Sequence, residues 1–323
     1  MKEIIIDTNE AGQRLDKFLG KYLNEASKSF YYKMLRKKNI VLNDKKASGN
    51  EKLSVGDSVK LYLSDETIEK FSSIRIQKAS SELDIIYEDE NILLINKPVG
   101  MLSQKAKNND VSLVEHLENY LLSTGALTTE SFRTFRPSIC NRLDRNTSGI
   151  VVAGKTLSGL QAMGELFKTR NLKKYYWCLV RGILKEGQFI KGYLKKDVRA
   201  NTVTISSKML PDSLPVETEY RPLAYADGVT LLEVHLITGR THQIRAHLAS
   251  INHPIVGDMK YGDTGINQRY LKECALKSQL LHARRIEFPY LGGVLSKVSE
   301  KSFTADLPDN FCQILEKKNC LVQ

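Results

Sequence analysis

Short apolar runs separated by polar turns dominate the chain from Leu83 onward, and their spacing most restricts the possible fold. Residues 92–96, 202–206 and 230–236 have the length and composition of strands. Helical periodicity is less frequent and does not alternate regularly with these strands. This order favours an α+β fold with a mostly antiparallel mixed sheet over a series of regular βαβ units.

Turn and capping signals place the other elements of this part. Ser112 and Glu115 form a capping box that begins a helix ending near Ser123. Thr241 is the expected N-cap of a helix over residues 241–251, and a short helix is expected near the end of the chain. Further strands are predicted at residues 83–87, 174–180, 189–194, 216–224, 280–287 and 302–305, and a further helix at residues 157–169.

The first 64 residues are more densely basic than the rest. The 323 residues include 48 Lys and Arg against 37 Asp and Glu, a net charge of +11. Residues 1–64 hold 13 basic and 8 acidic residues, so this short part alone carries +5. Such an excess favours a polyanionic partner, either nucleic acid or an acidic membrane surface.

The same part has readable elements. Apolar residues at helical spacing predict a helix over residues 13–23, and Ser27 can cap a second helix. Strands are expected at residues 40–43 and 59–63. Residues 65–82 are polar without sustained periodicity and are interpreted as a linker. We therefore predict a small α/β domain at residues 1–64, a linker at 65–82 and a larger domain at 83–323.

Composition argues against a membrane or secreted protein. No apolar run approaches the ~20 residues that a membrane-spanning helix needs, and residues 1–7 include the acidic Glu3 and Asp7 where a signal peptide would be basic. The five cysteines are scattered and odd in number, which is typical of a reducing compartment. We expect a cytoplasmic protein with no membrane partner.

Two motifs suggest ligands that their surroundings argue against. Residues 149–156 match a phosphate-loop pattern, but their interior, Ile150 to Ala153, has the composition of a buried strand. His242 and His247 are five residues apart, unlike the i, i+4 pair of a zinc site. These two residues and His253 are interpreted as structural or RNA-facing, and we expect neither a nucleotide cofactor nor a metal.

Two segments concentrate charge beside apolar strands. Asp144 lies between Arg142 and Arg145, which favour the charged form of its carboxylate. Such a carboxylate is either an inert member of an ion pair or an anionic nucleophile or base. In the second segment Arg240 lies in a turn and Arg245 on a helix, a pattern that a basic surface helix would also show.

Taken together, the ordered motifs of about residues 83–290 resemble those of the RluA family of pseudouridine synthases. These motifs are Asn96-Lys-Pro-Val-Gly100, Arg142-Leu-Asp-Arg-Asn-Thr-Ser-Gly149, Lys174-Tyr-Tyr176, Thr238-Gly-Arg-Thr-His-Gln-Ile-Arg245, His253-Pro-Ile-Val-Gly-Asp258 and Leu281-His-Ala283. The first part is similar to the small RNA-binding domain named after ribosomal protein S-four, through Arg14-Leu-Asp-Lys-Phe-Leu19, Ile40-Val-Leu-Asn43 and Leu53-Ser-Val-Gly-Asp-Ser-Val59. The two-domain arrangement is most similar to the RluC and RluD type of ribosomal large-subunit enzyme.

The resemblance implies an isomerisation in RNA, in which the N1–C1′ bond of a uridine breaks, the base turns, and C5 joins C1′. It implies that Asp144 is the catalytic carboxylate, which either adds covalently to the nucleoside or removes a sugar proton. It further implies that Arg245 pairs with Asp144, and that Tyr176 stacks on the uracil and is a candidate for assisting loss of the C5 proton. No cofactor or metal is needed. Candidates for phosphate contacts or pocket support are Arg142, Arg145 and Arg240.

The resemblance also implies an RNA-binding face on the N-terminal domain, to which we assign Arg14, Arg36, Lys37 and Lys38. The alternative is a solvated helix end whose basic residues complement the helix dipole. One departure is Asn141, where the family usually has His. Asn cannot become cationic at neutral pH, so the departure bears on local RNA contact and on the subgroup.

These inferences predict a monomeric RNA pseudouridine synthase that acts on large-subunit (23S) ribosomal RNA. Two alternatives stay open from the sequence. One is a non-catalytic RNA-binding or ribosome-assembly factor on the same scaffold, and the other is the same enzyme acting on transfer RNA.

Overall fold

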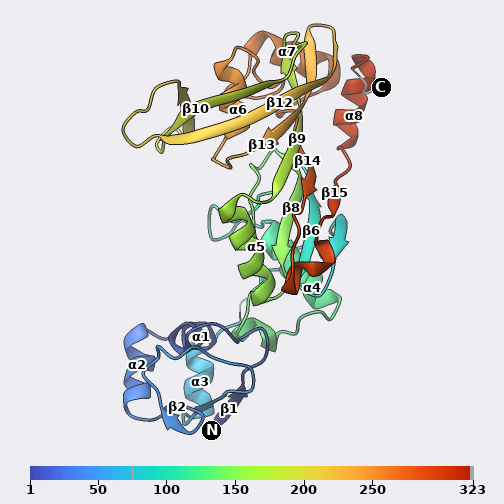
Figure 1. Ribbon diagram of the computed structural model, residues 1–323. Helices are drawn as coiled ribbons and strands as arrows, with labels where there is room; N and C mark the ends of the chain where they lie inside the picture. The colour runs from blue at the N-terminus through green and yellow to red at the C-terminus, as the bar shows by residue number, and fades with distance from the viewer. Residues whose placement is uncertain (75, 321–323) are drawn as a thin grey trace.

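The computed structural model describes residues 1–74 and 76–320 and has an elongated shape (Figure 1). At one end, within residues 1–74, two helices pack on a small antiparallel sheet whose strand order is β1-β4-β2-β3. Ser27 caps the second helix as predicted, because its hydroxyl accepts a hydrogen bond from the Phe30 backbone N–H at 3.3 Å. The elements are β1 (Lys2–Ile5), α1 (Leu15–Tyr22), α2 (Lys28–Arg36), β2 (Ile40–Leu42), β3 (Lys45–Lys46) and β4 (Ser58–Leu61).

The predicted linker begins too early, because helix α3 (Asp65–Phe71) occupies its first residues. Ser64 caps this helix by accepting from the Thr67 N–H at 3.2 Å. Ile68 is buried in the N-terminal core, and the Phe71 ring lies 4.5 Å from that of Phe30, centroid to centroid. A seven-residue helix with a polar outer face is too short to give a sustained periodic signal. The rest of the predicted linker includes residue 75, which lies outside the described residues.

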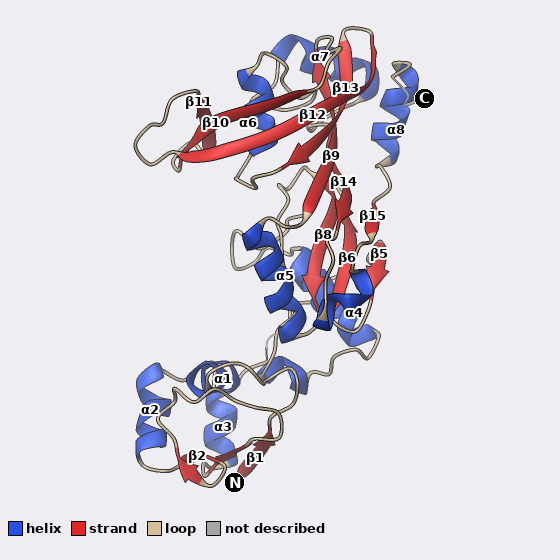
Figure 2. Cartoon of the chain, in the orientation of Figure 1, coloured by secondary structure: helices blue, strands red, loops and turns tan. Residues whose placement is uncertain are grey.

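The remainder of the chain is built on one large sheet (Figure 2). Among the described residues its order is β11-β10-β12-β13-β9-β14-β8-β6-β5, with β15 paired to β14 and β7 to β8. Every strand pair in this set is antiparallel except β14–β8, so the predicted α+β fold with a mostly antiparallel mixed sheet is confirmed. The strands are β5 (Ile85–Glu88), β6 (Ile92–Lys97), β7 (Ser138–Ile139), β8 (Ser148–Gly154), β9 (Lys173–Arg181), β10 (Gln188–Asp197), β11 (Thr202–Ser206), β12 (Leu214–Ala226), β13 (Val229–Leu236), β14 (Leu281–Glu287) and β15 (Ser302–Thr304).

Helices cover both faces of this sheet. Alternate residues of β6 enter two different cores: Leu93 and Ile95 pack with α4 (Leu113–Ser123), whereas Ile92 and Leu94 pack with α5 (Leu157–Thr169). The predicted capping box begins α4, and α5 has the predicted bounds. The other helices are α6 (Gln243–Ser250), α7 (Thr264–Cys274) and α8 (Asp309–Lys317).

Other details also differ from the expectations, and strands β1, β3 and β7 were not predicted. Helix α7 was not predicted, because Tyr270 is the buried residue that anchors its eleven-residue span and a single apolar contact gives no stripe. His242, rather than Thr241, is the N-cap of α6, and it adopts a left-handed conformation with φ 52°. Short 3-10 turns also occur at Glu130–Arg133 and Gly293–Val298.

Residues 149–154 of the phosphate-loop match lie in β8, which is buried along its whole length, as its composition predicts. A side chain at Gly149 would meet the backbone oxygen of Ala283 at 2.3 Å, and one at Gly154 would meet Leu160 at 2.4 Å. The two glycines of the pattern therefore allow β14 and α5 to approach closely.

Contacts at the first 3-10 turn link the N-terminal domain to the rest of the chain. Arg133 Nη1 donates to Ser72 Oγ at 2.5 Å, and the guanidinium lies 5.8 Å from the centre of the Tyr22 ring. Thr134 Oγ1 donates to Glu10 Oε1 at 2.6 Å. Within residues 1–74 and 76–320, no helix combines the length and apolar character needed to cross a membrane.

Candidate active site

Asp144 lies in the loop between β7 and β8, and hydrogen bonds on both sides fix that loop. Ser103 Oγ donates to the Leu143 carbonyl at 2.8 Å and accepts from the Leu143 N–H at 3.0 Å. Arg145 Nε donates to the Gly100 carbonyl at 3.0 Å, and the Gly100 N–H donates back to the Arg145 carbonyl at 2.9 Å. The residues on either side of Asp144 are therefore hydrogen-bonded to Ser103 and Gly100.

Lys97 also holds the loop that carries Asp144. Its side chain is fully buried, and Nζ donates to the carbonyls of Pro98 at 2.8 Å, Met101 at 2.9 Å and Arg145 at 3.2 Å. These three acceptors match the three donors of an ammonium group. Burial lowers the pKa of Lys97 to about 8, while the nearby charge of Asp144 acts in the opposite direction.

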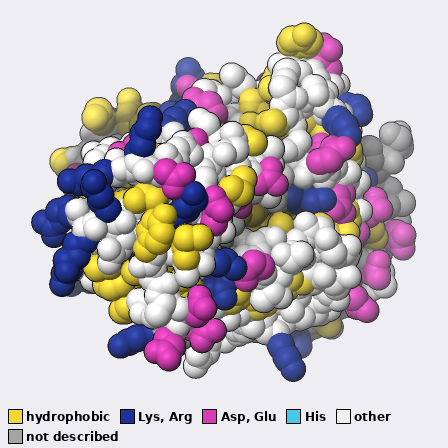
Figure 3. Space-filling view, turned by 90° about the horizontal axis from the view of Figure 1, so that it is seen from below, with side chains coloured by type: hydrophobic (Ala, Val, Ile, Leu, Met, Phe, Trp, Pro, Cys, Tyr) yellow, Lys and Arg dark blue, Asp and Glu magenta, His cyan; other side chains and the backbone are white. Residues whose placement is uncertain are grey.

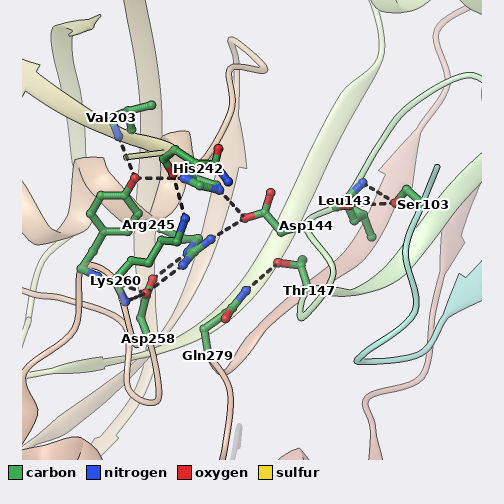
Figure 4. A network of polar contacts seen from close by, with 12 residues as sticks. Ser103, Leu143, Asp144, Thr147, Val203, His242, Arg245, Asp258, Lys260 and Gln279 are labelled. Carbon is green, nitrogen blue, oxygen red and sulfur yellow. Dashed lines mark hydrogen bonds and ion pairs between the residues drawn. The ribbon is translucent and has the colours of Figure 1, made fainter. Parts of the chain in front are cut away.

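Arg245 joins two carboxylates at the base of the site (Figure 4). Its Nη1 donates to Asp144 Oδ2 at 2.7 Å, while Nε and Nη2 donate to the two oxygens of Asp258 at 2.7 and 2.9 Å. The Arg245 and Asp258 side chains are 7% and 0% exposed, whereas that of Asp144 is 28% exposed. The buried pair therefore orients Arg245, and Arg245 holds the accessible carboxylate.

The electrostatics of this chain of charges follow from burial and pairing. Burial alone would raise the pKa of Asp258, but the hydrogen bonds and charge of Arg245 hold it below its usual value. Burial alone would lower the pKa of Arg245, yet the two carboxylates raise it. Arg245 is consequently a permanent cation next to Asp144.

Tyr176 extends into the site from β9, where it pairs with Val234 of β13 and Ala283 of β14. It is 7% exposed and belongs to the main core, so the ring is held rigidly by its neighbours. Burial, and secondarily the charge of Asp144, raises the pKa of its hydroxyl. The ring thus presents a neutral phenol to the site.

These groups line a cavity of about 910 Å³. Of the described residues that line it, Asp144 is the only acidic one, whereas eight are basic. Five of the eight were not predicted as site residues, although Lys174 begins the motif Lys174-Tyr-Tyr176, because the sheet order brings their segments together. These five are Lys105, Lys168, Arg170, Lys174 and Lys196.

Comparison with known proteins assigns this arrangement to a family. Residues 91–250 match the model of the family described as RNA pseudouridylate synthase. The ribosomal large subunit pseudouridine synthase C of Escherichia coli is 33% identical over 302 residues, covering 86% of this chain and 88% of that protein. The enzyme of the same name from Vibrio parahaemolyticus is 33% identical, covering 88% and 87%. The chain belongs to the RluA family of RNA pseudouridine synthases.

A solved structure gives the same assignment for the fold of the synthase. Human RNA Pseudouridylate Synthase Domain Containing 4 aligns with a TM-score of 0.59 and 22% identity, over 74% of this chain and 94% of that one. The family reaction makes the protein an isomerase with an RNA substrate.

The buried side chain of Gln243 holds the turn at residues 238–242, between β13 and α6. Gln243 Oε1 accepts from Thr238 Oγ1 at 2.8 Å and from the Arg240 N–H at 3.1 Å. Gln243 Nε2 donates to the Glu217 carbonyl at 3.0 Å. This clamp ties the start of α6 to β12 and thereby places Arg240 and His242 at the cavity.

The three arginines expected to contact phosphate occupy different environments. Arg142 is exposed at the cavity. Arg240 also lines it, and its buried Nε has no hydrogen-bond partner among the described residues. Arg145 is exposed but uses Nε to hold Gly100. Arg142 and Arg240 are therefore better placed than Arg145 to meet RNA.

The basic residues of the N-terminal domain also differ in whether they have a partner within the protein. Arg36, Lys37 and Lys38 are exposed at the end of α2. Viewed from below, Lys and Arg side chains gather along the left edge, the side on which α2 lies in Figure 1 (Figure 3). Arg14, by contrast, donates through Nε and Nη2 to the buried Asp16 at 3.0 and 2.9 Å. Arg14 thus has a structural partner, and the α2 residues form the more accessible basic surface.

Asn141 has a role that the sequence did not reveal. Its Oδ1 accepts from the Val152 N–H at 2.8 Å, and its Nδ2 donates to the Ile150 carbonyl at 3.3 Å. The amide therefore pairs with the backbone of β8 as a neighbouring strand would. At this position the amide uses one donor and one acceptor, so Asn141 has a structural role in holding β8.

The histidines interpreted as structural or RNA-facing have hydrogen-bond partners. His247 Nδ1 lies 2.9 Å from Thr218 Oγ1, and burial lowers the pKa of His247 to about 4. His253 Nδ1 lies 2.8 Å from the Arg181 carbonyl. Across the described residues, no group of three or more His, Cys, Asp or Glu side chains could hold a metal ion.

Proposed function

We propose that this synthase converts uridines of large-subunit ribosomal RNA to pseudouridine, with Asp144 as the carboxylate that acts at the junction of sugar and base. The observation that carries the proposal is that, among the described lining residues, a basic cavity holds one acidic group, Asp144, bound at 2.7 Å by a buried arginine. An anion that is fixed in direction and open to the cavity is suited to react.

The reaction is an isomerisation that keeps the elemental composition of the uridine. The N1–C1′ bond breaks, the base turns, a C5–C1′ bond forms, and the hydrogen on C5 leaves as a proton while N1 gains one. Asp144 acts either by adding to the nucleoside and later leaving, or by removing a sugar proton. Both roles require the charged carboxylate, which Arg245 stabilises and orients.

Tyr176 supplies an aromatic face for the uracil once the base has left its helix. The pKa of its hydroxyl is raised by burial, so the phenol is neutral at physiological pH. A neutral phenol suits stacking. In this proposal it assists removal of the C5 proton only by passing its own proton on at the same time.

Charge distribution supports a long RNA substrate. Arg142 and Arg240 would contact phosphates around the extruded nucleotide, while the end of α2 would contact RNA farther away. Two relatives that match over most of their length are named ribosomal large subunit pseudouridine synthase C. We further infer that the protein acts in the cytoplasm, because these bacterial relatives are named as enzymes of the ribosomal large subunit. We also propose that it acts as a monomer.

The test is a site-resolved pseudouridine map of ribosomal and transfer RNA from cells with and without the gene. We expect one or more large-subunit ribosomal sites to be lost on deletion, restored by the wild-type gene and not by Asp144→Asn. If only transfer RNA sites were lost, the proposal that large-subunit ribosomal RNA is the substrate would be wrong. Restoration of every site by Asp144→Asn would overturn the catalytic assignment and favour a non-catalytic RNA-binding role.

A further inference from the structure

His242 stands beside the proposed catalytic carboxylate but has no role in the reaction described above. Its Nε2 lies 3.7 Å from Asp144 Oδ2, the same oxygen that Arg245 binds, and its side chain is 8% exposed. Figure 4 shows the imidazole and the guanidinium approaching Asp144 from the same side. Among the described residues, no hydrogen bond or ion pair involves Asp144 Oδ1.

Tyr261 determines which ring nitrogen of His242 carries the proton. The Tyr261 hydroxyl accepts from the Val203 N–H at 2.8 Å, because a backbone N–H can only donate. Its other contact is His242 Nδ1 at 2.9 Å, toward which it can direct its own hydrogen. Nδ1 is then an acceptor, and the proton of a neutral ring lies on Nε2, the nitrogen that faces Asp144.

We propose that His242 is a positioning residue: with its tautomer fixed by Tyr261, it directs an N–H at Asp144 Oδ2 and leaves Oδ1 free for the nucleoside. The inference rests on the role of Asp144 proposed above. Arg245 and His242 would together fix both the position and the rotation of the carboxylate. Arg245 alone contacts one oxygen and leaves rotation about that contact open.

The charges around His242 favour the neutral ring that this arrangement needs. Burial lowers its pKa, the charge of Asp144 acts against this, and the neighbouring Arg245 and Lys260 lower the pKa further. Asp258 raises it, and Tyr261 contributes its hydroxyl. A neutral donor orients Asp144 without cancelling the negative charge that the reaction uses.

The same contacts connect Asp144 to the outer hairpin of the sheet. Val203 belongs to β11, and Lys260 Nζ donates to the Asn201 carbonyl at 2.8 Å in the turn that precedes it. Lys196 and Asn201 of this hairpin also line the cavity. RNA held by the hairpin would therefore stabilise the Val203–Tyr261–His242 contacts and, through them, the direction of the carboxylate.

Two substitutions distinguish a role of His242 as an N–H donor from a role in packing alone. Asn places its amide near the position of Nδ1 and keeps a partner for Tyr261, whereas Gln places an N–H near the position of Nε2. His242 has φ 52°, a conformation that Asn tolerates better than Gln does. Backbone strain alone would thus favour His242→Asn, while the proposed donor favours His242→Gln.

The experiment measures release of tritium from total RNA that was labelled with 5-tritiated uridine in the deletion strain, since every conversion removes the C5 hydrogen. We expect His242→Asn to lower the single-turnover rate at saturating enzyme about 30-fold. The enzyme concentration that gives half the maximal rate should stay within about twofold of wild type, since the RNA contacts are intact. His242→Gln should recover most of the lost rate, and Tyr261→Phe should lower it about fivefold.

The controls distinguish the possible failures. His116→Asn, on α4 and outside the lining of the cavity, should match wild type. A wild-type rate in His242→Asn, with Asp144→Asn inactive, would overturn the positioning role alone. Equal losses in the Asn and Gln variants, with equal melting temperatures, would overturn it as well. Activity in Asp144→Asn would instead overturn the proposed function. If neither His242 variant folds, a wild-type rate in Tyr261→Phe would overturn the proposal.

Discussion

The catalytic cavity and the end of helix α2 are both basic, yet they hold their charges in opposite ways. In the cavity, Arg245 is buried, binds two carboxylates and receives its orientation from Asp258. At the end of α2, Arg36, Lys37 and Lys38 project from consecutive positions into solvent. Chemistry at one atom needs a fixed direction, whereas attraction to phosphate needs only charge. Substitutions in the two regions should therefore change different measured quantities.

The largest effect is expected for Asp144→Asn, which removes the reactive charge and keeps the shape. The single-turnover rate should fall about 1000-fold or more, because no other acidic group lines the described part of the cavity. RNA affinity should stay within about twofold of wild type, since an amide still accepts a hydrogen bond from Arg245. Tritium release and filter binding measure the two quantities. If Asp144→Asn lowered RNA affinity as much as the rate, the cavity and the end of α2 would not have separate roles in chemistry and binding.

Arg245→Met should affect stability as well as activity. Asp258 would become a fully buried carboxylate without its partner, which costs about 3–5 kcal/mol of the free energy of unfolding. Urea unfolding measures this quantity. The matched control is Arg142→Met, at an exposed arginine of the same cavity, for which we expect a change within about 0.5 kcal/mol. Similar losses in both variants would show that Arg245 and Asp258 are not a stability-determining pair.

Lys97 should give the cavity region a distinct pH dependence. Burial lowers its pKa from 10.5 to about 8, so between these values the unfolded chain binds more protons than the folded protein. The contribution of Lys97 to stability therefore rises with pH in this window, and the cost of burying its charge is present in full only below about pH 8. Relative to Lys97→Met, wild type should gain about 2 kcal/mol between pH 7.5 and 10.

Urea unfolding of both proteins at several pH values provides the measurement, and the difference between them removes the shared titration of other groups. Activity should fall over the same window, because a neutral amine has two N–H donors for three carbonyls and loosens its hold on Arg145. A pH-independent difference in stability would contradict this account of Lys97.

Local signals in the sequence predicted much of the fold. The capping box at Ser112 predicted α4, and the apolar stripe between Thr156 and Arg170 predicted α5 with the bounds that the structure has. Helices α3 and α7 were missed, because each buries a single side chain of its own, Ile68 or Tyr270. Periodicity records an apolar stripe, so a helix held mainly by its ends and one contact leaves little trace.

The candidate site was predictable to a different degree. Asp144, Tyr176 and Arg245 were singled out because their motifs resemble those of a family, and the structure brings them to one cavity. The five further basic residues of the cavity were not, since their proximity depends on pairing between strands far apart in the sequence, such as β14 with β8. Asn141 was judged by its charge, but its role depends on the β8 backbone beside it.

The smallest effect is expected in the N-terminal region. Replacing Arg36, Lys37 and Lys38 together by Gln should lower the affinity for large-subunit ribosomal RNA about tenfold at 150 mM salt, and should reduce the slope of log affinity against log salt by about 2. The single-turnover rate at saturating enzyme should not change, because these side chains lie in a different domain from Asp144. A control triple of exposed residues, Lys272, Lys277 and Lys301 to Gln, removes the same charge from the catalytic domain. If both triples reduce the slope equally, net charge rather than a defined face attracts the RNA; if only the α2 triple does, the basic end of α2 is the binding surface.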